Sequence, residues 1–148
     1  TFCCRDFENH GLNGNVSQCS ISLNTKKNTL RGMHYQKKPY AEAKLVRCSR
    51  GFIYDVIVDL RYDSSTFKEW TSIEISAENR KMVYVPEGFA HGFQTLTDNV
   101  EVIYQMSQFY SPSHADGFRW DDPSFRIDWP SKDLVISLKD QNYPDFKL

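Results

Sequence analysis

The sequence lacks the features of membrane proteins and of nucleic-acid-binding proteins. No apolar run approaches the roughly 20 residues that a membrane-spanning helix needs, and runs such as Val56-Ile57-Val58 soon end. The 18 basic and 19 acidic residues are mixed along the chain, so there is no basic stripe of the kind that binds nucleic acid. The first residues do not combine a charged segment with an apolar one, and we expect no signal peptide.

Cysteine is scarce and forms no informative pattern. Cys3, Cys4, Cys19 and Cys48 make neither a zinc-like CxxC pair nor a dense disulfide spacing. Reduced thiols are typical of the cytoplasm, which is the location we predict. The chain begins at Thr1, without methionine, in residues that resemble the end of a strand. We therefore expect a further N-terminal segment before it.

The sequence does contain a series of short strand patterns separated by turns. Apolar and polar residues alternate, with many β-branched and aromatic side chains, at 18–24, 51–61, 71–76, 81–86 and 100–110. Helices are expected only near 5–10 and 131–135. The pattern predicts a single all-β domain over 1–148, built as a barrel or jelly roll. The tail that contains Trp120 and Trp129 should form a loop-rich coat.

The segment TLRGMHYQ at 29–36 places two polar side chains where a regular strand would separate them. Residues three apart point to opposite faces of a pleated strand, so Arg31 and His34 should diverge. Glycine inside a strand often marks a bulge or a close approach of the backbone. A break at Gly32 would let both side chains face one cavity.

The segment VPEGFAHGF at 85–93 has the P-x-G-x-x-H spacing that resembles the second motif of cupin barrels. This spacing points His91 into the barrel, although a buried histidine without chemistry would fit it equally well. The metal sites of cupins typically have an H-x-H pair and a glutamate on the earlier strand. Here that strand offers only His34, followed by Tyr35 and Gln36, so we predict no metal.

Four further residues allow both a functional and a structural interpretation. Lys44 could stabilise a developing oxyanion from inside the barrel, or lie in solvent on an edge strand. Asp55, between apolar neighbours, could orient a histidine or form a salt bridge. Tyr104 and Tyr110 are six residues apart and would share one face of a regular strand. Either tyrosine alone is more often a core residue than a catalyst.

Five segments in order make the pattern recognisable: 30–36, 43–61, 76–93, 117–130 and 136–140. Together they resemble the dTDP-4-dehydrorhamnose 3,5-epimerase family of the cupin superfamily, over about residues 1 to 144. The resemblance implies a cupin-type jelly roll in a homodimer. It also implies an isomerase of deoxysugar biosynthesis that inverts C3 and C5 of a nucleotide-linked 4-keto-6-deoxyhexose, with no cofactor.

The resemblance assigns a role to each catalytic candidate. His34 matches the base, Asp140 the carboxylate that orients it, and Tyr104 the proton donor on the opposite face. Lys44 matches a residue beside the sugar, where its charge would bear on the enolate oxygen. Histidine suits this reaction because its pKa lies near neutrality and a hydrogen next to a ketone is weakly acidic.

The resemblance also assigns the substrate-binding residues. They are Arg31 and His91 around the sugar and diphosphate, Tyr110 against the nucleotide base, and Lys139, Gln18 and Ser20 at further nucleotide contacts. Ser20 stands where the family tends to have asparagine, and Ala115 where it has glutamate. An Asp-Glu-Arg-Gly-like stretch of the family would precede Thr1. Nucleotide recognition is thus where this sequence departs from the family.

Other functions remain open at the level of sequence. The chain could be a 3-epimerase only, a 3,4-ketoisomerase or a sugar-nucleotide-binding barrel without turnover. Retention of His34, Lys44, Tyr104 and Asp140 together speaks against a barrel without turnover. A metal-dependent cupin oxygenase or isomerase is the alternative from another class.

Overall fold

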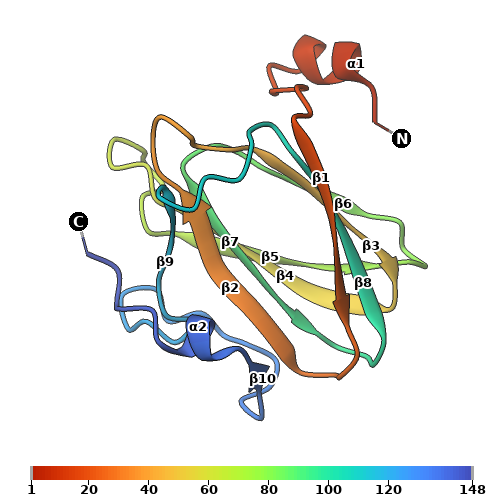
Figure 1. Ribbon diagram of the computed structural model, residues 1–148, viewed down its shortest axis with the longest axis vertical. Helices are drawn as coiled ribbons and strands as arrows, with labels where there is room; N and C mark the ends of the chain where they lie inside the picture. The colour runs from red at the N-terminus through yellow and green to blue at the C-terminus, as the bar shows by residue number, and fades with distance from the viewer. Residues whose placement is uncertain (1, 148) are drawn as a thin grey trace.

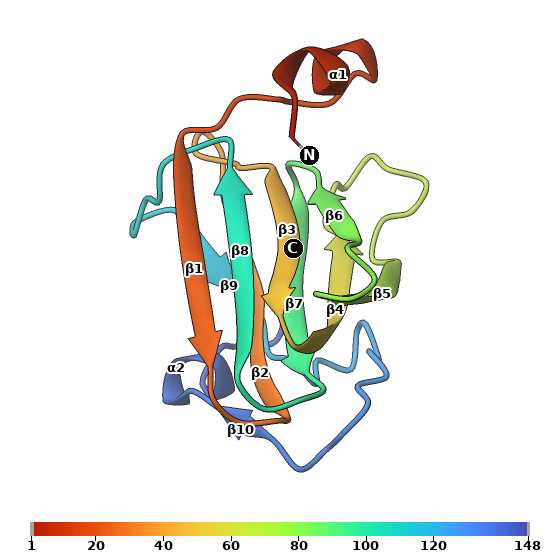
Figure 2. The same ribbon diagram turned by 90° about the vertical axis from the view of Figure 1, so that its right-hand side faces the viewer.

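The structure is a computed structural model that describes residues 2–147, and its strands form two facing sheets (Figure 1). The four-stranded sheet, which faces the viewer in Figure 2, has the order β1 (Gln18–Asn24), β8 (Val100–Met106), β3 (Lys44–Arg50) and β6 (Met82–Val85). The second sheet has the order β10 (Val135–Ile136), β2 (Thr29–Gln36), β7 (Phe89–Thr95), β4 (Phe52–Asp59) and β5 (Trp70–Ser76), with β9 (Ala115–Gly117) paired to β2. The predicted all-β jelly roll is confirmed.

The observed elements correct the sequence prediction at three places. β8 ends at Met106 and not at 110, so Tyr110 lies beyond the strand. No helix forms at 131–135. Val135 and Ile136 pair with β2 instead, and the helix begins only after Ser137, whose side chain caps it by accepting from the Asp140 N–H. Helix α2 (Leu138–Gln141) begins there, while α1 (Cys4–Asn9) lies near its predicted position. Of the predicted strand end at the start of the chain, Thr1 lies outside the described residues and 2–3 form no strand.

Both faces of β4 are buried, which explains why its sequence is apolar on both sides. Ile53 packs with Phe93 and Val46 in the core between the sheets. Val56, on the other face, packs under the C-terminal coat with Trp129. The coat is held together in part by the Trp129 indole, which donates to the Trp120 carbonyl at 2.9 Å. The predicted loop-rich coat is thus confirmed.

Gly32 lets β2 cross very close to β7. The β2–β7 register shifts between Arg31 and His34, which is the predicted irregularity. Gly32 has a φ of +128°, and a Cβ built there would lie 2.6 Å from the Cα of Gly92. A side chain at this position would therefore clash with the backbone of the neighbouring strand.

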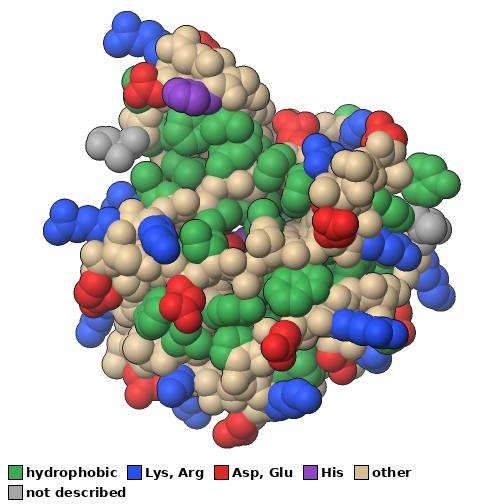
Figure 3. All heavy atoms as spheres, turned by 180° about the vertical axis from the view of Figure 1, so that it is seen from behind, with side chains coloured by type: hydrophobic (Ala, Val, Ile, Leu, Met, Phe, Trp, Pro, Cys, Tyr) green, Lys and Arg blue, Asp and Glu red, His purple; other side chains and the backbone are tan. Residues whose placement is uncertain are grey.

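The surface bears charges of both signs. Seen from behind, blue and red side chains alternate around the molecule and do not gather into one basic area (Figure 3). Within 2–147, the helices are all too short or too polar to cross a membrane.

Candidate functional site

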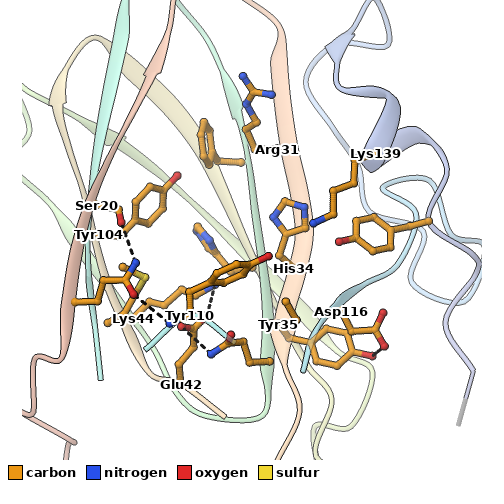
Figure 4. Close-up of a pocket in the computed structure, with 17 residues that line it drawn as sticks. Ser20, Arg31, His34, Tyr35, Glu42, Lys44, Tyr104, Tyr110, Asp116 and Lys139 are labelled. Carbon is orange, nitrogen blue, oxygen red and sulfur yellow. Dashed lines mark hydrogen bonds and ion pairs between the residues drawn. The ribbon is translucent and has the colours of Figure 1, made fainter. Parts of the chain in front are cut away.

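A cavity of about 340 Å³ lies between the two sheets (Figure 4). It is lined by Gln18, Ser20, Arg31, His34, Lys44, His91, Tyr104, Tyr110 and Lys139 among others. Every predicted site residue except Asp140 therefore lines this one cavity. His34 reaches it from β2, and Tyr104 and Lys44 reach it from the opposite sheet. The shift at Gly32 brings Arg31 and His34 to the same space.

Asp140 lies behind His34 and hydrogen-bonds it. The His34 Nε2–Asp140 Oδ1 distance is 2.6 Å, and the Asp140 side chain is 4% exposed while that of His34 is 38% exposed. Burial alone would raise the pKa of Asp140, but the hydrogen bonds from His34 and Ser137 hold it below its usual value. The Asp140 carboxylate accepts a hydrogen bond from the Nε2–H of His34, and in this tautomer Nδ1 carries the lone pair that can take a proton.

His91 forms a second histidine–carboxylate pair. Its Nε2 lies 2.8 Å from Oδ2 of Asp55, and both side chains are almost fully buried. Asp55 therefore lies beside a histidine, as one of its two sequence interpretations predicts. Its Oδ1 atom has no hydrogen-bond partner among the described residues.

Tyr104 faces His91 across the cavity. Their rings meet edge to face, with centroids 6.2 Å apart. Burial and the nearby charge of Asp55 raise the pKa of Tyr104 well above its usual value. The hydroxyl therefore keeps its proton at neutral pH.

Lys44 faces the interior and not the solvent, since it lines the cavity, and its strand β3 lies between β8 and β6 and is no edge strand. Its Nζ lies 3.0 Å from Glu42 Oε1, with 13% of the lysine side chain and 8% of the glutamate side chain exposed. Glu42 was missed in the sequence. The only signal was its place two residues before Lys44, which puts both on one face where the chain is extended.

The open end of the cavity carries the aromatic and amide groups. Tyr110 is 54% exposed, and its backbone N–H donates to Gln18 Oε1 at 3.0 Å. Gln18 in turn donates to Ser20 Oγ at 3.4 Å. Lys139 lies over the ring of Tyr143, and the nearby Tyr143 hydroxyl raises the lysine pKa. Tyr143 carried no sequence signal, because it lies in the irregular C-terminal coat.

Arg31 is held from β1. Its Nε donates to Oδ1 of Asn24 at 3.1 Å, and Asn24 is only 3% exposed. This orienting contact was also missed in the sequence. Within residues 2–147, no three histidine, cysteine or acidic side chains lie close enough together to hold a metal ion.

Comparisons with known proteins place the chain among sugar-nucleotide epimerases. A family model described as dTDP-4-dehydrorhamnose 3,5-epimerase matches residues 1–147. An enzyme of that name from Shigella flexneri is 47% identical over 120 residues, which are 81% of this chain and 66% of the relative. The chain thus spans just under two thirds of that relative's length.

Two solved structures have the same fold. The Bacillus anthracis enzyme, with TDP and pyrophosphate bound, superposes with a TM-score of 0.95 at 40% identity, covering 98% of this chain and 83% of that one. The Legionella pneumophila enzyme, in complex with dTDP-4-keto-L-rhamnose, gives 0.90 at 30% identity, covering 100% and 85%.

Proposed function

The chain belongs to the dTDP-4-dehydrorhamnose 3,5-epimerase family, and from this premise we propose that it inverts C3 and C5 of a dTDP-linked 4-keto-6-deoxyhexose. The observation that carries the proposal is the placement of the base and the acid. His34, paired with Asp140, and Tyr104 line one cavity from opposing sheets. A sugar ring between them would be deprotonated on one face and reprotonated on the other.

His34 is the base of the proposed reaction. Its Nδ1 takes the hydrogen next to the 4-keto group, and the electrons of that C–H bond delocalise onto the ketone oxygen. Asp140 fixes the tautomer and stabilises the imidazolium that forms, as in other carboxylate–histidine pairs. A positioned base of this kind contributes about 10²- to 10⁴-fold to the rate.

Lys44 is proposed to stabilise the enolate oxygen. Its ammonium group is largely buried, so its charge acts in a low dielectric, and Glu42 holds it in place. Tyr104 then gives its proton to the carbon from the other face. Because its pKa is raised, the phenol is protonated when the enolate forms.

The other predicted site residues that line the cavity are proposed to bind the substrate. The Arg31 guanidinium can bind diphosphate oxygens as a fork, and His91 would lie against the sugar. Tyr110 would stack on the nucleotide base at the open end of the cavity. Lys139, Gln18 and Ser20 would complete the nucleotide contacts there.

The Tyr110→Ala variant is expected to bind dTDP about ten- to a hundredfold more weakly, since stacking of a base on an aromatic ring is worth about 1–3 kcal/mol. Its kcat at saturating substrate should change little, because the ring does not reach the reacting carbons. Titration calorimetry with dTDP alone measures the effect. Phe109→Ala is the matched control, since Phe109 is 62% exposed and does not line the cavity. Equal dTDP affinity in Tyr110→Ala and parent would contradict the stacking role.

The protein is proposed to be a cytoplasmic homodimer. Ile21 and Leu23, on the outward side of β1, are 61% and 69% exposed, which is unusual for adjacent large side chains on one strand face. A second copy packed on this side should bury more than about 1,000 Å². Light scattering during size-exclusion chromatography should give a molar mass of twice the chain. In an Ile21→Asp/Leu23→Asp variant the measured molar mass should fall toward that of one chain. A parent protein that elutes as a monomer at micromolar concentration would contradict the dimer.

The direct test of the proposed function is conversion of dTDP-4-keto-6-deoxyglucose to dTDP-4-keto-L-rhamnose without added metal. Recovery of unchanged sugar nucleotide would contradict it. Metal analysis of the purified, active protein separates the proposal from a metal-dependent cupin enzyme. Stoichiometric iron, manganese or zinc would favour that second class.

A further inference from the structure

Tyr110 follows the end of β8, yet hydrogen bonds hold the backbone on both sides of it. Its own N–H donates to Gln18 Oε1 at 3.0 Å. The carbonyl of Phe109, which belongs to the same peptide group, accepts from Gln36 Nε2 at 3.2 Å. The N–H of Ser111 donates to Gln36 Oε1 at 2.7 Å. The peptide groups before and after Tyr110 are therefore both held, which restricts its φ and ψ and with them the direction of its ring.

The side-chain amide of Gln36 is oriented by these contacts and has no donor to spare. The Ser111 N–H can only donate, while the carbonyls of Phe109 and Tyr40 can only accept. Those two carbonyls lie 3.2 and 2.9 Å from Nε2 and take both of its hydrogens. The remaining contact, with Glu42 Oε2 at 3.4 Å, is the longest. Gln36 is 6% exposed and lines the cavity, but its amide holds protein backbone.

We propose that Gln36 is a positioning residue for Tyr110, which it holds ready at the open end of the cavity. The inference rests on the proposed function, in which the Tyr110 ring stacks on the nucleotide base. Ordering a loop and its side chain on binding costs affinity, and a ring that is held in advance avoids that cost. Gln36 lies on β2 two residues after His34, so the stacking ring is fixed to the strand that carries the catalytic histidine.

The test is a double-mutant cycle on the affinity for dTDP, measured by titration calorimetry. Methionine has about the length of glutamine but cannot form the bonds to Phe109 and Ser111. In Gln36→Met we expect dTDP to bind about two- to tenfold more weakly, the factor that corresponds to ordering one side chain on binding. In a protein that already carries Tyr110→Ala, the same change should lower the affinity no further, because the positioned ring is absent. Equal losses in both backgrounds would overturn the positioning role.

Turnover gives a second readout. In Gln36→Met the KM for dTDP-4-keto-6-deoxyglucose should rise with the dissociation constant of dTDP, while kcat at saturating substrate should fall much less. Gln36 reaches Oε2 of Glu42 whereas Lys44 pairs with Oε1, so the Lys44 contact does not depend on Gln36. A fall in kcat at unchanged KM would contradict the inference.

Gln94 provides a matched control, because it holds a different loop in the same way. It is fully buried on β7, donates to the Ser131 carbonyl at 2.9 Å and accepts from the Ser131 N–H at 3.0 Å. It does not line the cavity. Gln94→Met should lower the melting temperature, since it also leaves backbone groups unpaired, but should bind dTDP as the parent does. Equal weakening of dTDP binding in Gln94→Met and Gln36→Met would contradict a specific role of Gln36.

A second substitution covers the case in which Gln36→Met does not fold. Gln36→Asn keeps a polar amide at the buried position but is one methylene too short to hold the backbone at 109–111. It should weaken dTDP binding in the presence of Tyr110 and leave the Tyr110→Ala protein unchanged. Parent affinity in folded Gln36→Asn would overturn the positioning role.

The outcomes separate this inference from the proposed function. A parent protein that does not bind dTDP contradicts the proposed function itself. A parent that binds dTDP and inverts the sugar, together with Gln36→Met at the parent affinity, contradicts the positioning role and leaves the epimerase proposal standing. A loss of affinity that is present with Tyr110 and absent without it supports the inference.

Discussion

The His34→Ala variant is expected to show neither inversion of the sugar nor deuterium at C3. Without the imidazole, no group paired with Asp140 can take the hydrogen next to the ketone, and the enolate does not form. The loss should be about 10²- to 10⁴-fold or larger, the usual contribution of a general base. Product formation and wash-in are both read by proton NMR in deuterated water.

The control for this variant is its stability. The His34 side chain is 38% exposed, so its removal opens no sealed cavity, but it leaves the buried Asp140 without its partner. The melting temperature should therefore be measured beside the activity, with the exposed histidine variant His10→Ala as a matched substitution. A folded His34→Ala protein that exchanges C3 hydrogen at the parent rate would show that His34 is not the base.

The Tyr104→Phe variant is expected to fail in a different way. The base survives, so the enolate still forms and is reprotonated from the face that it left. This variant should exchange hydrogen for deuterium at C3 while it yields little inverted product. Phenylalanine keeps the edge-to-face contact with His91 and removes only the hydroxyl, so the fold should be little affected.

Tyr62→Phe is the matched control, because Tyr62 is 76% exposed and does not line the cavity. It should invert both centres at the parent rate. Parent-rate inversion of C3 and C5 by a well-folded Tyr104→Phe protein would remove Tyr104 as the acid. Loss of exchange and inversion together, with a lowered melting temperature, would instead indicate a structural role.

The strands were predictable where alternation is strict and turns are clear. β1 has the predicted bounds, and β4 and β5 lie within a few residues of theirs. The predicted strand at 100–110 was too long, because its sequence pattern continues to Tyr110 whereas β8 ends at Met106 and a loop follows. The prediction failed at 131–135, where a two-residue pairing with β2 competes with a weak helix signal.

The site was predictable to the extent that its residues lie on strands. Gly32 indicated that Arg31 and His34 could share a cavity, since a break in the pleat is the only local means of turning both inward. The pairing of Asp140 with His34, 106 positions apart, came from the family resemblance alone. No periodicity in either segment relates residues so distant in sequence.

The supporting contacts were beyond the reach of the sequence. Asn24 contacts Arg31 of another strand and Tyr143 contacts Lys139 of helix α2, while Glu42 pairs with Lys44 only two residues away. Polar residues of these types are common in loops and at strand ends, so apart from the spacing of Glu42 and Lys44 their presence carries no signal. Only the packing of the two sheets shows which of them face the cavity.

The most direct test of the central claim is the NMR spectrum of the parent protein's product, formed from dTDP-4-keto-6-deoxyglucose in deuterated water. The account predicts deuterium at both C3 and C5, inversion of both centres, and the same rate with and without a chelator. Deuterium and inversion at C3 alone would make the protein a 3-epimerase. An absence of exchange at both carbons, in protein that is folded and binds dTDP, would contradict the account.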